Sequence, residues 1–431
     1  PRGKQRWIRD SFACWYVQTT GIWKSVWIES VPDVYLEHLK LTPDLHNGRL
    51  EVEAMIGGLQ ERDVRMRPVN SLTEDADKQT EMKKRSLHLC ASFDKKRAGD
   101  VTVEVTGPQV HAVIDLSSTD ITPLGIMEWS PETPNLYDLE AEILEDGCSA
   151  DKVCSYFGMR EIRIDNGIVL LNGKPLYQRL ILDQGYWKDS GLTPPDEQAL
   201  INDIDKIRRM GFNGLRKHQK TEDERFLYWC DAKGMLVWSE TPAAYEFSER
   251  AQEYFTKEWM ALIRQNYSHP CVIVWTPFNE SWGVRQVETD YRQQQFTEGI
   301  YHLTKAYDPF RPVVSNDGWE HTVTDLVTLH DYVEKGEDFL EHYLNHKDEI
   351  LSTQMYHSKE KSAFANGYTY SGQPVLISEY GGIAFGGHDG EWGYGNTVRD
   401  EDEFLARYDA ITTAIKKVPW ICGFCYTQVS D

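Results

Sequence analysis

The stretch that decides the fold of this chain spans residues 212–240 and has the sequence FNGLRKHQKTEDERFLYWCDAKGMLVWSE. Its two ends, 212–216 and 235–239, are short apolar segments of the kind that form buried strands. Residues 222–233 between them form an amphipathic pattern with helical spacing, and Gly234 is placed to end that helix. A strand, a helix and a second strand in this order predict a βαβ unit with parallel strands.

The same unit recurs along the rest of the chain. A second helix is expected at 196–210, with apolar residues at turn spacing and Gly211 at its end. The strands expected from this rhythm are 176–182, 212–216, 235–239, 272–278, 312–316, 326–330, 374–378 and 421–427. Eight such repeats predict a (β/α)8 barrel, or TIM barrel. Because the last strand lies close to Asp431, we expect the helix that would close the barrel to be missing.

The first part of the chain has a different pattern. Residues 23–29, 49–56, 101–106 and 138–144 alternate apolar and polar side chains, as half-buried antiparallel strands do. Polar loops and a proline-containing turn at 129–137 separate these segments. The pattern predicts a β-sandwich before the barrel.

Composition excludes several classes of function. The chain has 431 residues, more than one hydrophobic core usually supports, so several domains are expected. A formal net charge of −22 without a compact basic stripe argues against a nucleic-acid partner, and no apolar stretch is long enough for a membrane span. The eight cysteines are scattered, and Cys422 and Cys425 lie in an apolar strand pattern that does not suit a redox motif. The compartment is not readable, and a homo-oligomer stays possible.

Polar and aromatic side chains follow the expected barrel strands. A TIM barrel carries its active site at the carboxyl ends of its strands, so these side chains should meet at one mouth. Sugars suit such a mouth, because their hydroxyls bind carboxylates, amides and imidazoles while their apolar faces stack on aromatic rings. The candidate substrate-binding residues are Asp183, Arg216, His218, Asn279, Asp317, Trp319, His330, Tyr332 and Trp392. For Asp183, His218, His330 and the two tryptophans, the alternative is a packing or structural hydrogen-bonding role.

Two carboxylates of the mouth, Glu280 and Glu379, are the catalytic candidates. Glycoside cleavage needs one carboxyl to protonate the leaving oxygen and another to meet the charge at the anomeric carbon. If configuration is retained, the two carboxyls should lie about 5–5.5 Å apart. We expect Glu280 to stay protonated near neutral pH and Glu379 to be held ionised, with Arg216 as a counter-ion. An alternative for Arg216 is a purely structural ion pair with Glu240 or Glu379.

These residues resemble motifs of glycoside hydrolase family 2, the family of β-galactosidases, β-glucuronidases and β-mannosidases. Asn279-Glu280-Ser281 resembles the acid/base motif of the family, and Ile377-Ser-Glu-Tyr-Gly381 resembles its nucleophile motif. The resemblance implies the end of a jelly-roll sugar-binding domain at 1–32, an immunoglobulin-like β-sandwich at 33–157 and the catalytic TIM barrel at 158–431. It also implies a retaining, exo-acting, β-galactosidase-like hydrolase of terminal β-linked sugars.

Some positions depart from the family pattern. The strand-two motif appears as Arg216-Lys-His-Gln-Lys220, so Arg216 matches directly and His218 only with a shift. The Asn-x-Lys element that holds a uronic acid is absent, because Gly395-Asn-Thr-Val398 has no lysine, and this disfavours uronic acid substrates. The Glu-x-His of metal-dependent relatives is also absent after strand three, so no metal and no cofactor is expected.

Two alternatives remain open at this stage. The chain could be a non-catalytic carbohydrate-binding fragment, although the presence of both glutamates argues against it. It could also be a transglycosidase or an endo-acting glycosidase that uses the same two residues.

Overall fold

The computed structural model describes residues 2–6, 13–59, 83–117, 125–358, 360–386 and 393–429. The chain forms two compact units. The smaller unit comprises Val26–Glu161 with Tyr267–Pro270, and the larger comprises Pro1–Ser25, Ile162–Asn266 and Cys271–Asp431.

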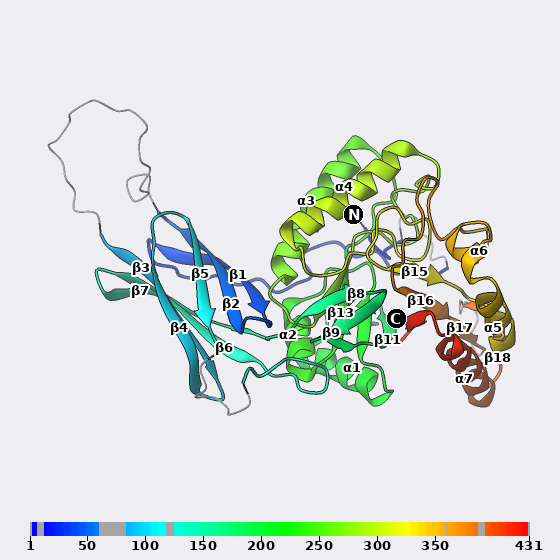
Figure 1. Cartoon of the computed structure of the whole chain (residues 1–431), viewed down its shortest axis with the longest axis horizontal. Helices are drawn as coiled ribbons and strands as arrows, with labels where there is room; N and C mark the ends of the chain where they lie inside the picture. The colour runs from blue at the N-terminus through cyan, green and yellow to red at the C-terminus, as the bar shows by residue number, and fades with distance from the viewer. Residues whose placement is uncertain are drawn as a thin grey trace. The chain divides into compact units, whose positions relative to one another are not determined.

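The smaller unit is an antiparallel β-sandwich (Figure 1). One sheet has the order β1-β2-β5, with β1 Tyr35–Asp44, β2 Arg49–Gly57 and β5 Gln109–Asp115. The other has the order β4-β3-β6-β7, with β3 Arg85–Phe93, β4 Lys96–Glu104, β6 Tyr137–Glu145 and β7 Cys148–Phe157. Alternate residues of β6, such as Leu139 and Ile143, are fully buried in the core. Each buried side chain of this size stabilises the fold by about 1.5–3 kcal/mol, so alternation fixes which face of the strand turns inward.

The strand expected at 23–29 is wrong. These residues form neither helix nor strand, and Trp27 and Ile28 are 63% and 98% exposed. No described strand pairs with this stretch, and alternation alone cannot make a strand without a partner.

The larger unit contains a curled parallel sheet with the order β14-β13-β12-β11-β19-β16-β15. Its strands are nearly all buried, as strands covered on both faces are. They are β11 Gln178–Asp183, β12 Gly214–Lys217, β13 Leu236–Glu240, β14 Val272–Thr276, β15 Val327–His330, β16 Val375–Gly381 and β19 Ile421–Thr427. The TIM-like barrel predicted from the βαβ rhythm is confirmed.

One of the eight expected barrel strands is not regular. This segment, 312–316, forms an isolated parallel bridge to β14 between Val313 and Trp275. Just beyond it, Asp317 forms a second isolated bridge with Asn279. Backbone hydrogen bonds still join this segment to both neighbours, with Val314 N donating to Trp275 O at 2.9 Å and His330 N donating to Gly318 O at 3.2 Å. The segment therefore bridges the two edges of the sheet without forming a strand.

Helices follow the strands of the barrel unit. Asp196 caps α1 by accepting a hydrogen bond from Ala199 N, and Gly234 ends α2 with φ of 70°, as the sequence predicts. In Figure 1, α3 and α4 lie side by side. The helices are α1 Glu197–Arg209, α2 Glu224–Lys233, α3 Glu249–Asn266, α4 Tyr291–Tyr307, α5 Gly336–Asn345, α6 Lys347–Leu351 and α7 Glu401–Lys417. Short strands complete the unit: β8 Ile162–Asp165, β9 Ile168–Leu171, β10 Lys174–Pro175, β17 Ile383–Phe385 and β18 Tyr394–Val398.

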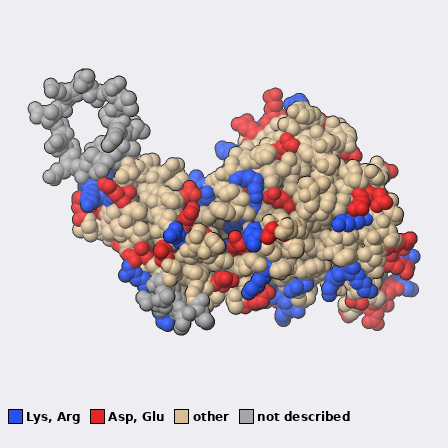
Figure 2. All heavy atoms as spheres, in the orientation of Figure 1, with Lys and Arg blue, Asp and Glu red and all other residues tan. Residues whose placement is uncertain are grey.

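The surface carries mixed charge. In Figure 2, lysine and arginine side chains lie among aspartates and glutamates on the face shown. Among the described residues, no helix is both long and apolar enough to cross a membrane.

Candidate active site

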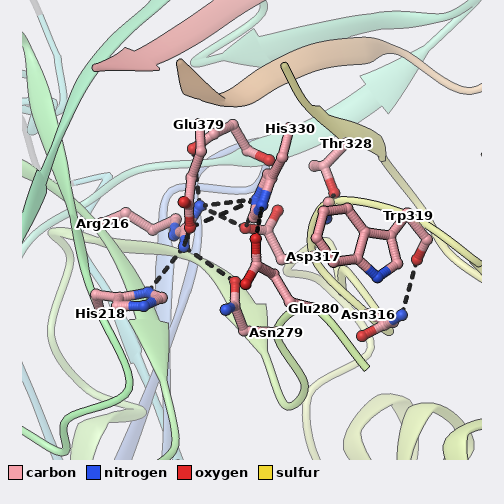
Figure 3. A network of polar contacts seen from close by, with 12 residues as sticks. Arg216, His218, Asn279, Glu280, Asn316, Asp317, Trp319, Thr328, His330 and Glu379 are labelled. Carbon is pink, nitrogen blue, oxygen red and sulfur yellow. Dashed lines mark hydrogen bonds and ion pairs between the residues drawn. The ribbon is translucent and has the colours of Figure 1, made fainter. Parts of the chain in front are cut away.

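A buried cluster of charged side chains lies where the barrel strands end (Figure 3). Arg216 comes from β12, Glu240 from β13, His330 from β15 and Glu379 from β16. Asn279 and Glu280 follow β14, and Asp317 belongs to the irregular fifth segment. The parallel register places Arg216 opposite Trp238 and His330 opposite Glu379, so their side chains point to the same interior.

Arg216 is the centre of this cluster and is fully buried. Its guanidinium forms ion pairs with three carboxylates, those of Glu240, Asp317 and Glu379, the last at 2.5 Å. It also donates to Asn279 Oδ1 at 3.1 Å and to the carbonyl of Ser378 at 2.7 Å. A planar guanidinium can hold several acceptors at fixed angles, which a lysine cannot do. Arg216 therefore fixes the positions of acids from three different segments.

Both carboxylate oxygens of Glu379 have donors. Oε1 accepts from Arg216 and Oε2 accepts from the hydroxyl of Tyr332. The Tyr332 ring stacks on Tyr394, with centroids 3.4 Å apart and planes 12° apart. Glu379 is therefore oriented from two sides, and its side chain is only 6% exposed.

Glu280 has a different environment. Its backbone is left-handed, with φ of 50°, and Ser281 follows with φ of 57°. Glu280 N donates to Asp317 O at 2.9 Å, and Ser281 N donates to Asn316 Oδ1 at 2.9 Å. The Glu280 side chain is 20% exposed, which makes it more accessible than Glu379.

His330 connects the acids. Its Nδ1 atom lies 2.9 Å from Glu280 Oε1, and its Nε2 atom lies 2.9 Å from Asp317 Oδ2 and 3.6 Å from Glu379 Oε1. Burial alone would lower the pKa of His330, but the charges of Glu379 and Asp317 outweigh it and raise the pKa to about 10. The imidazole is therefore a cation at neutral pH.

The cation His330 changes the expected ionisation of the glutamates. Burial raises the pKa of Glu280, but the hydrogen bond and charge of His330 prevail and hold it below its ordinary value. The pKa of Glu379 is also lowered, because His330 and Arg216 together outweigh burial. The expectation that Glu280 stays protonated in the resting site is therefore wrong, since the sequence did not place a histidine cation beside it.

Glu280, His330 and Glu379 each place one oxygen or nitrogen atom within 4.8 Å of those of the other two. This arrangement could in principle hold a cation. Both ring nitrogens of a protonated His330 carry hydrogens, so the ring has no lone pair to offer a metal. In this protonation state, His330 and Arg216 are the cations that these carboxylates face.

Glu240 is the charged residue of the cluster that the sequence argument did not include in the site. It is 1% exposed, pairs with Arg216, and accepts a hydrogen bond from Gln219 N at 2.9 Å. Burial raises the pKa of Glu240 to about 7, although Arg216 opposes this. Its position at the end of β13, the strand next to the one that carries Arg216, was the available signal.

The other expected site residues lie in different places. His218 lies 2.8 Å from Arg216 and 3.1 Å from Glu240, and Trp319 packs edge-on against His330 at 5.4 Å. Asp183 does not join this cluster. It pairs with Lys217 at 2.8 Å, and Lys217 also pairs with Glu222 at 2.7 Å. Trp392 lies outside the described residues.

The position of Asp183 follows from strand alternation. Asp183 lies opposite Lys217 in the parallel register of β11 and β12, and Lys217 is the neighbour of Arg216. Successive side chains of a strand point to opposite faces, so Arg216 and Lys217 cannot both face the same interior. The expected meeting of Asp183 with the Arg216 cluster is therefore wrong.

The N-terminal segment contacts loops at this edge of the barrel. Gly3 N donates to Ala243 O, and the indole of Trp15 donates to the hydroxyl of Tyr245 at 2.9 Å. Tyr16 stacks on Tyr186 with centroids 4.1 Å apart. These partners follow β13 and β11, so the segment crosses the edge where the strands end.

Comparison with known proteins agrees with this architecture. The family descriptions "Glycosyl hydrolases family 2" and "Glycosyl hydrolases family 2, TIM barrel domain" match residues 34–160 and 162–408. A β-galactosidase from Klebsiella pneumoniae is 26% identical over 74% of this chain, and one from Oenococcus oeni is 25% identical over 90% of it. The chain spans only about a third of the length of these two relatives, 30% and 35% respectively.

Solved structures show the same fold. A β-galacturonidase from Eisenbergiella tayi has a TM-score of 0.68 at 21% identity, over 92% of this chain and 65% of that one. A β-glucuronidase from Bacteroides uniformis has a TM-score of 0.69 at 18% identity, over 92% of this chain and 47% of that one. The family match over most of the barrel and all the strands of the sandwich shows that the chain belongs to glycoside hydrolase family 2.

Proposed function

We propose that this chain is the catalytic part of a retaining, exo-acting β-glycosidase of β-galactosidase type, with Glu379 as nucleophile and Glu280 as general acid/base. The separation of the two carboxylates carries the proposal. One oxygen of Glu280 and one of Glu379 lie within 4.8 Å of each other. A short separation of about 5–5.5 Å between carboxyls suits direct attack, whereas inversion needs about 6.5–9.5 Å to admit a water.

The assignment of roles rests on the different surroundings of the two acids. Glu379 is ionised and held at both oxygens, which orients it for attack on the anomeric carbon. Glu280 is more exposed and shares a hydrogen bond with protonated His330, which can supply a proton. A bound sugar would exclude water and raise the pKa of Glu280, so that the proton moves toward its carboxyl.

The reaction then has two steps. Glu379 forms a bond to the anomeric carbon, the bond to the glycosidic oxygen breaks, and Glu280 gives that oxygen its proton. In the second step, Glu280 takes a proton from water, the water oxygen attacks the anomeric carbon, and the ester bond to Glu379 breaks. Two displacements at the same carbon leave its configuration unchanged.

Two further observations support the substrate class. The relatives that are 25–26% identical are β-galactosidases, which favours a β-linked galacto-configured sugar. The N-terminal segment crosses the strand-end edge, and a mouth restricted in this way suits a terminal sugar better than the interior of a polysaccharide.

A mechanism-based trap tests this proposal. Incubation with dinitrophenyl 2-deoxy-2-fluoro-β-galactoside should give a protein whose mass increases by one fluorosugar, located by peptide mass spectrometry on Glu379. Nuclear magnetic resonance of the first product of a nitrophenyl β-galactoside should show the β anomer. Release of the α anomer would exclude retention, and sugar binding without nitrophenol release would support a carbohydrate-binding fragment instead.

A further inference from the structure

The ammonium group of Lys4 is buried at the mouth of the barrel, and none of the described residues gives it an acidic partner. Lys4 is 7% exposed, and its Nζ atom donates to Cys14 Sγ at 2.9 Å and lies 4.4 Å above the Trp15 ring. Among the residues that the structure describes, no carboxylate lies within 4.0 Å of this nitrogen. Buried cations are normally paired, because removal of an ammonium from water is unfavourable unless an anion compensates it.

The thiol does not provide that anion. Burial raises the pKa of Cys14, and although Lys4 opposes this, the nearby charges of Glu280 and Glu379 raise it further. Cys14 is therefore a neutral thiol at pH 7, and a thiol sulfur is only a weak acceptor. The positive charge of Lys4 stays uncompensated by its direct contacts.

The backbone and aromatic contacts of the N-terminal segment fix this lysine in place. Gln5 forms a β-bridge with Tyr16, which holds the two halves of the segment together. Trp15 packs edge-on against Trp282, two residues after Glu280, with centroids 5.3 Å apart. Lys4 and Cys14 are thus held beside the loop that carries the proposed acid/base.

The charges of Lys4 and of the proposed catalytic residues interact. Lys4 contributes to the lowered pKa of Glu280, after the larger effects of burial and His330, and it also lowers the pKa of His218. Such effects decline with distance and are screened by water, which agrees with the contact of Trp15 with Trp282 in placing Lys4 near the loop of Glu280.

The balance of charge among the side chains of the Arg216 cluster indicates what Lys4 binds. Four acids, Glu240, Glu280, Asp317 and Glu379, surround two cations, Arg216 and His330. An anionic sugar would be repelled by this excess of negative charge unless a further cation received its anionic group. A neutral sugar needs no such cation, and its hydroxyls would leave the charge of Lys4 uncompensated.

We propose that Lys4 and Cys14 form an oxyanion subsite that binds a carboxylate or a sulfate ester carried by the terminal sugar, so that the substrate is an acidic β-glycoside. This inference rests on the proposed function and deepens it. The lysine expected after Glu379 for a uronic acid is absent from 395–398, and Lys4 supplies a cation from the N-terminal segment instead. The absence of that motif therefore does not exclude an acidic substrate.

The test compares matched neutral and acidic substrates of the full chain. Nitrophenyl β-galactoside, β-galacturonide and 6-sulfo-β-galactoside share their leaving group and ring configuration, and the two acidic members separate a carboxylate from a sulfate. We expect a higher kcat/KM for one acidic substrate than for the neutral one. In Lys4→Met, kcat/KM for that acidic substrate should fall roughly 10- to 100-fold, the loss typical of a charged hydrogen bond. The value for the galactoside should change less than about 3-fold.

Two variants control for structural effects. Lys4→Arg keeps the charge and should recover part of the acidic activity, and Lys24→Met removes another lysine of the same segment and should not alter the ratio of acidic to neutral activity. Equal losses on neutral and acidic substrates in Lys4→Met would overturn the subsite, as would a wild-type preference for the neutral sugar.

A binding measurement separates this inference from the proposed function. Calorimetric titration with galacturonate, galactose 6-sulfate and galactose needs no turnover. Binding of an acidic sugar that is lost in Lys4→Met would support the subsite even if no glycoside were hydrolysed, in which case only the proposed function would fail. Hydrolysis of galactosides without Lys4-dependent binding of an acidic sugar would keep the function and overturn the subsite.

Discussion

His330 Nδ1 lies 2.9 Å from Glu280 Oε1, and the same imidazole faces Asp317 and Glu379 with its other nitrogen. The same cation therefore lowers the pKa of both proposed catalytic acids, and Arg216 adds to this effect at Glu379.

His330→Gln should shift the acidic limb of the kcat/KM profile toward higher pH. The pKa values of Glu280 and Glu379 are lowered in the protein, and loss of an adjacent cation should raise them by about 1–3 units. A pH series with a nitrophenyl β-glycoside measures this. His302→Gln, an exposed change on α4, is the control. An unchanged acidic limb in His330→Gln would show that His330 does not control these carboxyls.

Glu280→Ala and Glu379→Ala should differ in their response to the leaving group. A dinitrophenol departs without a proton, so Glu280→Ala should still form the glycosyl-enzyme and then accumulate it for want of a base. Glu379→Ala should lose on the order of 10⁴-fold or more on every substrate, with partial rescue by azide as the inverted product. Intact-protein mass spectrometry follows the adduct. Equal loss in both variants, without an adduct, would contradict the assigned roles.

Tyr332→Phe should lower kcat by roughly 10- to 100-fold, because a hydrogen bond to the charged Glu379 contributes about 1.5–3 kcal/mol. The rotation of the nucleophile is then less restricted, while the stacked ring remains in place. Tyr301→Phe removes a comparable bond to Asp325, 2.7 Å long, on α4 and should affect stability without affecting kcat. A Tyr332→Phe enzyme with full activity would mean that Arg216 alone orients Glu379.

Arg216→Met should reduce the free energy of unfolding by about 3–5 kcal/mol at neutral pH, because three buried carboxylates lose their shared partner. The pKa values of Asp317 and Glu379 are depressed in the folded chain, so the stability that they contribute is present above their ordinary pKa and is lost as pH falls. Urea unfolding should therefore show that the free energies of unfolding of Arg216→Met and of the wild type become more similar below about pH 4. Arg209→Met, exposed on α1, is the control, and a pH-independent difference would point to lost packing instead.

Asp183→Asn should lower stability by about 1–3 kcal/mol without a large change in kcat/KM, since Asp183 pairs with Lys217 rather than with the Arg216 cluster. Lys217 keeps Glu222 as a partner. Thermal unfolding and kinetics on one sample measure both quantities, with exposed Asp189→Asn as the control. A loss of more than about 10-fold in kcat/KM at unchanged stability would restore the role of sugar contact expected from the sequence.

Local sequence pattern predicted the strands and helices whose ends carry a recognisable signal, such as a glycine that stops a helix. The βαβ unit at 212–240 could be predicted because apolar strands, an amphipathic helix and Gly234 agree with one another. The segment 312–316 has the same apolar pattern, but its backbone pairs irregularly with its neighbours, which depends on tertiary context. Alternation at 23–29 failed for the related reason that a strand needs a partner.

The site could be predicted only to the extent that strand ends define it. Glu280 and Glu379 could be identified because they lie near the carboxyl ends of β14 and β16, and parallel strands deliver these ends to one edge. The direction in which the Asp183 side chain points depends on the register between β11 and β12, which a single sequence does not provide. The cationic state of His330 depends on three acids from different segments, and Lys4 approaches the mouth from a part of the chain far from it in sequence.

The left-handed backbone at Glu280 and Ser281 has an evolutionary consequence. Each non-glycine residue in this region costs about 1–2 kcal/mol relative to an ordinary conformation, and position 280 carries the carboxyl group that we propose as the acid/base. Glycine would relieve the conformational cost at position 280 but would remove the carboxyl group. Selection for folding stability alone would therefore favour glycine over glutamate at position 280. Selection for turnover would oppose that replacement. A descendant that abandoned hydrolysis should lose Glu280 early while keeping Arg216 and the rest of its folded architecture.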